Sequence, residues 1–169
     1  AITSRGAHLY SKKDYRGSLE CWRKIAKSRA QKDLRYEEVD GQARCHFQLK
    51  EYEEAYYHAT ALVAIAPGDS SAWEMHGSLG AKLEQPLARQ LESFLRSLAC
   101  DHPTFQVYFK IAEVYQQLNH LHVVQFLLYR ISRRFNSARH SFLYKTFEHQ
   151  LEELKRWSTA ATPSTEPMK

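Results

Sequence analysis

Two stretches of the sequence repeat the same pattern. KKDYRGSLECWRKIA at 12–26 and LKEYEEAYYHATALV at 49–63 each place a charged residue and a tyrosine ahead of apolar residues at helical spacing. Small residues recur at a matching interval: Ala43 and Gly77 lie 34 residues apart, and Gly77 and Ala112 lie 35 apart. Internal similarity near this period is typical of solenoids in which each repeat is one pair of stacked helices.

Apolar residues recur three and four positions apart along most of the chain, which is the spacing of one helix face. No stretch keeps the two-residue alternation of a half-buried strand. Within the helical body, prolines stand only at the breaks between these segments, at Pro67, Pro86 and Pro103. The sequence therefore predicts an all-α protein with short helices joined by short turns.

Four segments match one consensus in phase. The matching residues are Gly6, Leu9, Tyr15, Ser18, Trp22 and Ile25, then Ala43, Phe47, Tyr52, Ala55, Leu62 and Pro67, then Trp73, Gly77, Phe94, Leu98 and Pro103, and last Tyr108, Ile111, Ala112, Tyr115, Leu121, Val124, Leu128 and Ile131. The pattern resembles the tetratricopeptide repeat (TPR) family, whose first helix reads W-x2-L-G-x2-Y. His46 and Pro86 depart from it, because the family usually has aromatic residues at those positions.

The resemblance implies a right-handed superhelical stack of antiparallel helix pairs over residues 1–157. Small residues at the repeat positions would let the two helices of a pair approach closely. The Ser/Thr/Pro-rich end, 158–169, is expected to be a disordered linker. The expected units are about 1–33, 34–68, 69–103 and 104–136, followed by a capping helix at 138–157.

Charge is unevenly distributed although the net charge is only +5. Residues 1–35 hold ten Lys/Arg and three Asp/Glu, residues 36–128 hold six and twelve, and residues 129–169 hold eight and four. The ends are basic and the middle is acidic, which allows two kinds of charged surface on one protein. The acidic middle argues against a continuous track for a nucleic acid.

Cysteine content and hydropathy bear on the compartment. The three cysteines form no CxxC pair and are expected to be reduced thiols, which favours the cytoplasm or the nucleus. No apolar run approaches the roughly 18 residues that cross a bilayer, so no membrane contact is expected.

In the TPR family the first helix of each pair lines a concave groove that binds a peptide or a helix. The resemblance therefore implies a protein-interaction scaffold or adaptor that needs no cofactor. A mixture of aromatic, Met and charged side chains suits such a ligand, although it also suits an ordinary solvated face. The candidate groove residues are Tyr10, Asp40, Arg44, Phe47, Glu74, Met75, Lys82, Phe109, Lys110, Glu113 and Gln116.

Some members of the family hold the C-terminal carboxylate of a heat-shock chaperone with a Lys/Asn/Asn/Lys/Arg clamp. The corresponding positions here are Thr3, Ala7, Gly41, Ser71 and Met75, none of which matches. A clamp beginning one unit later gives only a partial match, with Asp40, Arg44, Met75, Gln106 and Lys110. We therefore expect no chaperone carboxylate clamp in this groove.

A second candidate surface is basic. Arg130, Arg133, Arg134 and Arg139 follow one another at the end of the fourth unit. Cations are favourable at a helix C-terminus, so these arginines suit helix capping on a solvated face. They equally suit contact with RNA or an acidic partner, which is the alternative function.

The sequence also bears on metal binding, catalysis and self-association. His120 and His122 are the closest pair of potential metal ligands, but no Cys, Asp or Glu accompanies them, so no metal site is expected. No nucleophile or phosphate-loop motif is present, and no enzyme is expected within the chain, although one elsewhere in a longer protein stays open. The C-terminal helix could also pair two copies through Phe142, Phe147 and Trp157.

Overall fold

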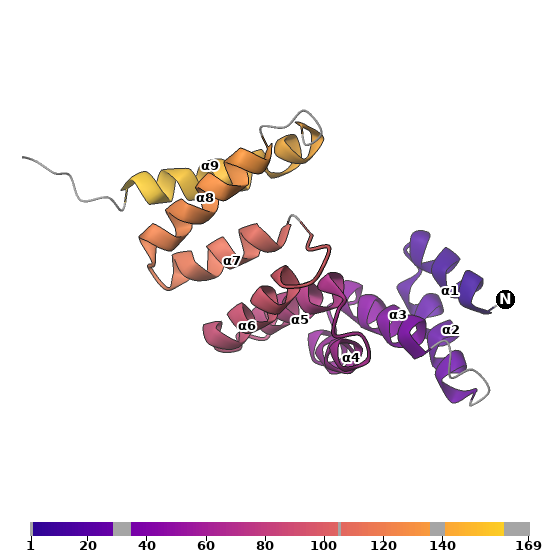
Figure 1. The fold of residues 1–169 in the computed structure, drawn as a ribbon. Helices are drawn as coiled ribbons and strands as arrows, with labels where there is room; N and C mark the ends of the chain where they lie inside the picture. The colour runs from indigo at the N-terminus through magenta and orange to yellow at the C-terminus, as the bar shows by residue number, and fades with distance from the viewer. Residues whose placement is uncertain (1, 29–34, 105, 136–140, 161–169) are drawn as a thin grey trace, which may run out of the picture. The chain divides into compact units, whose positions relative to one another are not determined.

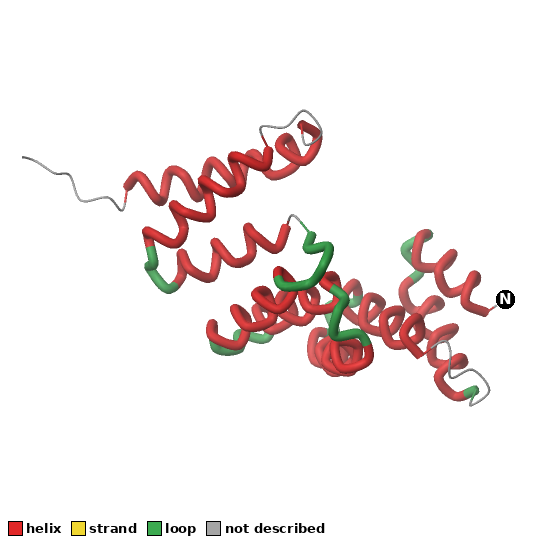
Figure 2. Tube along the Cα trace, viewed as in Figure 1, coloured by secondary structure: helices red, strands yellow, loops and turns green. Residues whose placement is uncertain are grey.

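A computed structural model describes residues 2–28, 35–104, 106–135 and 141–160. Every described element is an α-helix, and the described ranges contain no strand (Figures 1 and 2). The chain divides into two compact units, residues 1–104 and 105–169. The helices are α1 Ile2–Ser11, α2 Tyr15–Lys27, α3 Arg35–Gln48, α4 Tyr52–Ile65, α5 Ser70–Lys82, α6 Leu87–Leu98, α7 Gln106–Gln117, α8 Leu121–Phe135 and α9 Ser141–Ala160.

The first unit is a stack of three helix pairs. Helices α1 and α2, α3 and α4, and α5 and α6 pack within pairs, while α2 packs on α3 and α4 packs on α5 to join successive pairs. Helix α2 lies between α1 and α3, α4 lies between α3 and α5, and α6 packs on α5. Helices α1, α3 and α5 therefore form one layer of the first unit, and α2, α4 and α6 form the other. The prediction of an all-α repeat of helix pairs is confirmed.

The second unit contains α7, α8 and α9. Helix α9 packs on α8 and, less extensively, on α7, and Leu154 is among its buried residues. The sequence predicted this helix at 138–157 and a linker from 158, but the helix continues to Ala160. Ser158 is only 7% exposed, and its burial keeps the last turn packed against the unit. The side chains of Phe142 and Phe147 lie outside the described residues.

Close helix contacts occur where the sequence places small residues. A Cβ on Gly77 would lie 2.7 Å from a ring carbon of Phe94 on the partner helix of the same pair, which is closer than real Cβ atoms approach. Ala43 and Ala112, at the equivalent positions, are completely buried. The small side chains therefore allow the two helices of each pair to approach closely.

Four turns between paired helices share one backbone conformation. Lys13, Lys50, Glu84 and Asn119 all have positive φ angles, between 53° and 64°. In each turn the amide of this residue donates to a carbonyl three residues earlier, and the next amide donates to a carbonyl five residues earlier. This is the Schellman arrangement, which satisfies the last carbonyls of a helix and reverses the chain. The same turn therefore recurs between the two helices of each pair.

Candidate peptide-binding surface

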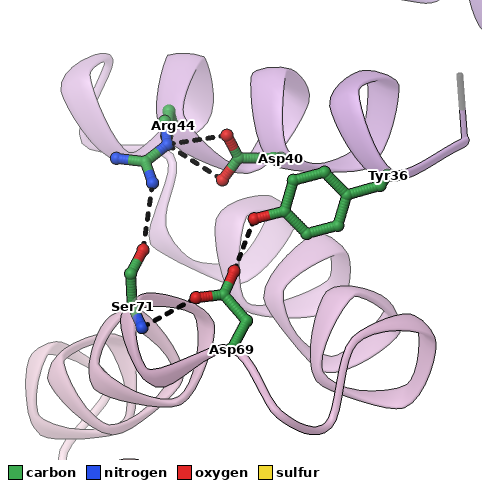
Figure 3. A network of polar contacts seen from close by, with 5 residues as sticks. All are labelled: Tyr36, Asp40, Arg44, Asp69 and Ser71. Carbon is green, nitrogen blue, oxygen red and sulfur yellow. Dashed lines mark hydrogen bonds and ion pairs between the residues drawn. The ribbon is translucent and has the colours of Figure 1, made fainter. Parts of the chain in front are cut away.

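A polar network joins α3 to α5 in the odd-numbered layer (Figure 3). Asp40 and Arg44 lie four residues apart on one face of α3, and Arg44 Nε is 2.9 Å from both oxygens of Asp40. Arg44 Nη2 also donates to Ser71 Oγ on α5, at 3.2 Å. The carboxylate and the hydroxyl together fix the guanidinium, so Arg44 is held in one orientation at the surface.

Asp69 connects the same helices at their N-terminal ends. One of its oxygens accepts from Ser71 N at 2.9 Å and caps α5, while the other accepts from the Tyr36 hydroxyl. Burial raises the pKa of Tyr36 well above its usual value, and the hydrogen bond to Asp69 adds to this effect. The Tyr36 hydroxyl therefore keeps its proton and remains a donor to Asp69.

A pocket of about 500 Å³ lies beside this network. It holds the carboxylates of Asp69 and Asp101, and no Lys or Arg is among its lining residues. No carboxylate–cation pair in the described residues involves either aspartate. The lining residues are Tyr36, Ala66, Gly68, Asp69, Ser70, Ser71, Asp101 and His102. The pocket is therefore negatively charged.

The C-terminal halves of α3 and α5 provide an apolar region. Phe47 is half-buried, and its ring makes an edge contact with Tyr52 at 6.0 Å between centroids. Met75 packs with them on a cluster of buried alanines and Leu79. Lys82 Nζ lies 5.9 Å from the centre of the Tyr52 ring, within cation–π range. Phe47 and Lys82 thus lie beside Tyr52, and Met75 packs on the same cluster.

The remaining predicted groove residues of the first unit have partners of their own. Tyr10 packs on the cluster around Trp22 and makes an edge contact with Tyr15 at 5.2 Å. Glu74 accepts a hydrogen bond from Thr104 Oγ1. All three predicted residues Tyr10, Asp40 and Glu74 are half-buried, so each still presents part of its surface to solvent.

The predicted groove residues of the second unit divide into two groups. Phe109 is only 1% exposed, so it is a core residue and offers no open contact surface. Lys110 Nζ lies 3.8 Å from a Glu113 carboxylate oxygen on the same helix. Glu113 and Gln116 line a pocket of about 460 Å³ between α7 and α9, together with Glu153, Leu154 and Arg156.

The predicted basic residues lie partly on α8. Arg130 and Arg133 are exposed, and each guanidinium lies over an aromatic ring of the same helix, Phe126 at 5.9 Å and Tyr129 at 5.8 Å. The Arg134 side chain and Arg139 lie outside the described residues. Two of the four arginines therefore share one helix surface.

The described residues contain no group of three or more metal-ligating side chains. Within them, no helix combines the length and the apolar character needed to span a bilayer. The thiols of Cys21, Cys45 and Cys100 are all free.

Three residues of the network were not predicted from the sequence. Tyr36 precedes Asp40 and Arg44 at four-residue intervals, a spacing that places all three on one face of α3 and could have indicated it. Asp69 and Ser71 cap α5 and carry no sequence signal for a contact with α3. Their contact with α3 depends on how the second and third pairs stack.

No protein-family model matches the chain, and no curated protein sequence matches it. Solved structures do. The first TPR domain of Spaghetti (RPAP3) bound to an HSP90 peptide is 18% identical with a TM-score of 0.62, covering 70% of this chain and 90% of that one. YrrB, a TPR protein with an unusual peptide-binding site, is 14% identical with a TM-score of 0.68, covering 97% of this chain and 86% of that one.

The TPR2B domain of yeast Sti1, in a complex with an Hsp70 peptide, is 12% identical with a TM-score of 0.66, covering 77% of this chain and all of that one. Sequence identities this low indicate a shared fold but do not indicate the ligand. The helix pairs, the close contacts at small residues and these likenesses agree with the repeat pattern in the sequence. The chain therefore has the tetratricopeptide-repeat fold.

Proposed function

We propose that the chain is a protein-interaction adaptor that binds a peptide segment of a partner along the layer formed by α1, α3 and α5. The observation that carries this proposal is the fixed polar network of Arg44 beside a pocket of about 500 Å³. A side chain held in place before binding loses little conformational entropy when the ligand arrives. Such a surface suits an extended ligand whose side chains alternate between pockets.

The charges of the surface specify the ligand further. The pocket carries Asp69 and Asp101 and has no Lys or Arg among its lining residues, so it suits a Lys or Arg side chain of the peptide. The region around Phe47, Tyr52 and Met75 suits an apolar side chain. We therefore expect a ligand segment with a basic residue and an apolar residue a few positions apart.

Two comparisons support peptide binding in general, because the Spaghetti (RPAP3) domain is bound to an HSP90 peptide and the Sti1 domain is in a complex with an Hsp70 peptide. The ligand proposed here differs from them. The positions that would clamp a terminal carboxylate hold Thr3, Ala7, Gly41, Ser71 and Met75. The free thiols favour a reducing compartment, and we expect the adaptor to act in the cytoplasm or nucleus.

The test is selection of a displayed library of random peptides on the chain, followed by fluorescence anisotropy with the selected peptides. We expect the selected sequences to share a basic and an apolar residue. Phe47→Ala and Asp101→Asn should each weaken binding by about tenfold, which corresponds to about 1.4 kcal/mol.

The matched control is Leu95→Ala, because Leu95 is 44% exposed on α6 in the other layer. It should leave the affinity unchanged. A library that yields no binders would contradict the proposal, as would peptides that bind both groove variants as tightly as the unchanged chain.

A further inference from the structure

One face of α8 is exposed and rich in aromatic and basic side chains. His122, Phe126, Tyr129, Arg130 and Arg133 are all exposed, with 58% of Phe126 and 56% of Tyr129 accessible. His122, Phe126 and Arg130 lie four residues apart, and so do Tyr129 and Arg133, so the five residues form one stripe along the helix. The opposite face is buried through Val124, Leu127, Leu128 and Ile131.

The α8 stripe, defined by these five exposed residues, carries uncompensated positive charge. Arg130 and Arg133 lie over the rings of Phe126 and Tyr129, and Arg133 Nη1 also lies 3.3 Å from the Tyr129 hydroxyl. Helix α8 contains no Asp or Glu. Among the described residues neither guanidinium is paired with a carboxylate. The α8 stripe therefore suits an anionic helix surface.

Helix α4 carries the complementary stripe. Glu53, Glu54, Tyr57, Thr60 and Ala64 are all exposed, and Tyr57, at 73%, is the most exposed large hydrophobic side chain among the described residues. Helix α4 contains no Lys or Arg, and neither glutamate is paired among the described residues. The opposite face is buried through Ala55, Ala59, Leu62 and Val63. The α4 stripe is thus acidic and partly aromatic.

We propose that the α8 stripe of one copy of this chain docks on the α4 stripe of a second copy, with the two helices antiparallel. Both stripes run over twelve residues, which is about 17 Å of helix. The order of side chains is complementary in that direction. The acidic N-terminal end of α4 meets the basic C-terminal end of α8, and the small residues of α4 meet the aromatic end of α8.

The antiparallel register is consistent at each contact. With Glu53 opposite Arg133, Tyr57 lies opposite Tyr129, because Tyr57 is four residues after Glu53 and Tyr129 is four residues before Arg133. Continuing the same register places Thr60 opposite Phe126, where a small side chain leaves room for the ring. One alignment therefore joins opposite charges, pairs two exposed tyrosines and accommodates the largest apolar side chain.

A second copy suits the α8 stripe better than a nucleic acid does. Each guanidinium lies over one face of an aromatic ring, and that face is then closed to a stacked base. The middle of the chain, 36–128, holds twelve Asp/Glu against six Lys/Arg and would repel a polyanion. The acidic partner surface, in contrast, is present on the chain itself.

The contact is heterologous, since two different surfaces meet, so a copy bound at α8 keeps its α4 stripe open. Association of this kind can continue head to tail. A contact between two single helix faces is small, and association is therefore expected to be weak and dependent on concentration and salt. It leaves the odd-numbered layer available for the ligand proposed above.

The test is sedimentation velocity of the whole chain over a hundredfold range of concentration. The weight-average sedimentation coefficient should rise with concentration and should fall back when salt is added. Arg130→Glu with Arg133→Glu should abolish the rise, and so should Glu53→Lys with Glu54→Lys. Circular dichroism of each variant shows whether the helices are intact.

Charge exchange makes the test specific. Combining all four substitutions restores opposite charges across the contact and should restore the rise. Mixing the two double variants should also restore it, because each supplies the surface that the other copy needs. The control for net charge is Lys24→Glu with Lys27→Glu on α2. It lowers the net charge by the same amount as the α8 variant and should leave association intact.

Three results would overturn the proposal. The first is a monomer at every concentration. The second is association that the α8 and α4 variants leave unchanged, which would indicate another face such as α9. The third is a chain that stays monomeric until a single-stranded RNA oligonucleotide is added. If Arg130→Glu with Arg133→Glu then abolishes this RNA-dependent association, the α8 stripe binds nucleic acid.

Discussion

The indole ring of Trp22 lies directly against the backbone of Gly41. A Cβ on Gly41 would lie 2.4 Å from Trp22 Cε2, and the indole is itself 92% buried. Trp22 is on α2 and Gly41 is on α3, so the contact joins the first helix pair to the second. The absence of a side chain at Gly41 thus sets how closely the two repeats stack.

Gly41→Ala is expected to lower the free energy of unfolding by about 2 kcal/mol, because overpacking a buried ring forces a shift of the helices or the indole. Urea unfolding followed by circular dichroism measures the change. The control is Gly68→Ala, since nothing lies within 4 Å of a Cβ at Gly68. Equal stability of both variants would show that the stack adjusts without strain.

Lys50→Gly is expected to raise the free energy of unfolding by about 0.5 kcal/mol. Lys50 has a φ of 62°, a conformation that disfavours residues with a Cβ and suits glycine. Part of the gain is offset by the greater freedom of glycine in the unfolded chain. Thermal unfolding measures the shift, and Glu20→Gly in the middle of α2 is the control, which should lower stability by about 1 kcal/mol. A loss of stability in Lys50→Gly would contradict the prediction.

Stability should fall as pH decreases from about 7.5 to 5.5. Burial lowers the pKa of His58, with nearby His46 and Arg23 adding to the effect, and burial lowers the pKa of His76 despite the opposing charge of Glu92. The unfolded chain therefore binds protons near pH 6.5 that the folded chain does not. This contribution to stability is fully present above pH 6.5 and is lost progressively as the pH falls below it, toward the lower pKa values of the folded chain.

Each histidine can contribute a slope of at most about 1.4 kcal/mol per pH unit. His76→Gln should flatten the dependence, because the amide does not titrate, and it can still bond to Ser93, whose Oγ lies 2.8 Å from His76 Nδ1. Urea unfolding at several pH values gives the slopes. An unchanged slope in His76→Gln would show that His76 does not titrate differently in the two states.

Asp69→Ala is expected to lower the free energy of unfolding more than Tyr36→Phe. Asp69 caps α5 by accepting from Ser71 N and also accepts from the Tyr36 hydroxyl. Its loss removes a cap, which is worth about 1 kcal/mol, and leaves the half-buried hydroxyl without its acceptor. Tyr36→Phe removes only the latter bond and keeps the cap. If urea unfolding gives the same loss of free energy for both variants, the cap by Asp69 does not stabilise the fold.

Helix type and pairing could be predicted from the sequence because both depend on local spacing. Residues three and four apart share a helix face, and the recurrence of small residues near 34 positions fixes which helices pair. The turns at Lys13, Lys50 and Glu84 could not be predicted, since their residues carry no glycine signal. The end of α9 was placed three residues early, because burial of Ser158 extends the helix beyond what composition indicates.

In the candidate surface, too, local spacing predicted some features and packing decided others. The sequence placed Asp40, Arg44 and Phe47 on one helix, but only the packing of α3 against α5 brings Arg44 to Ser71. Likewise, Phe109 has the repeat position of a groove residue, yet it is buried.

By itself the sequence determined which residues share a helix face, because that depends on a few neighbouring positions in the chain. The tertiary structure decided which of those faces are covered. Val124 and Tyr57 both lie on regular helices, and one is fully buried while the other is 73% exposed. That difference depends on contacts between residues far apart in sequence, which no local pattern records.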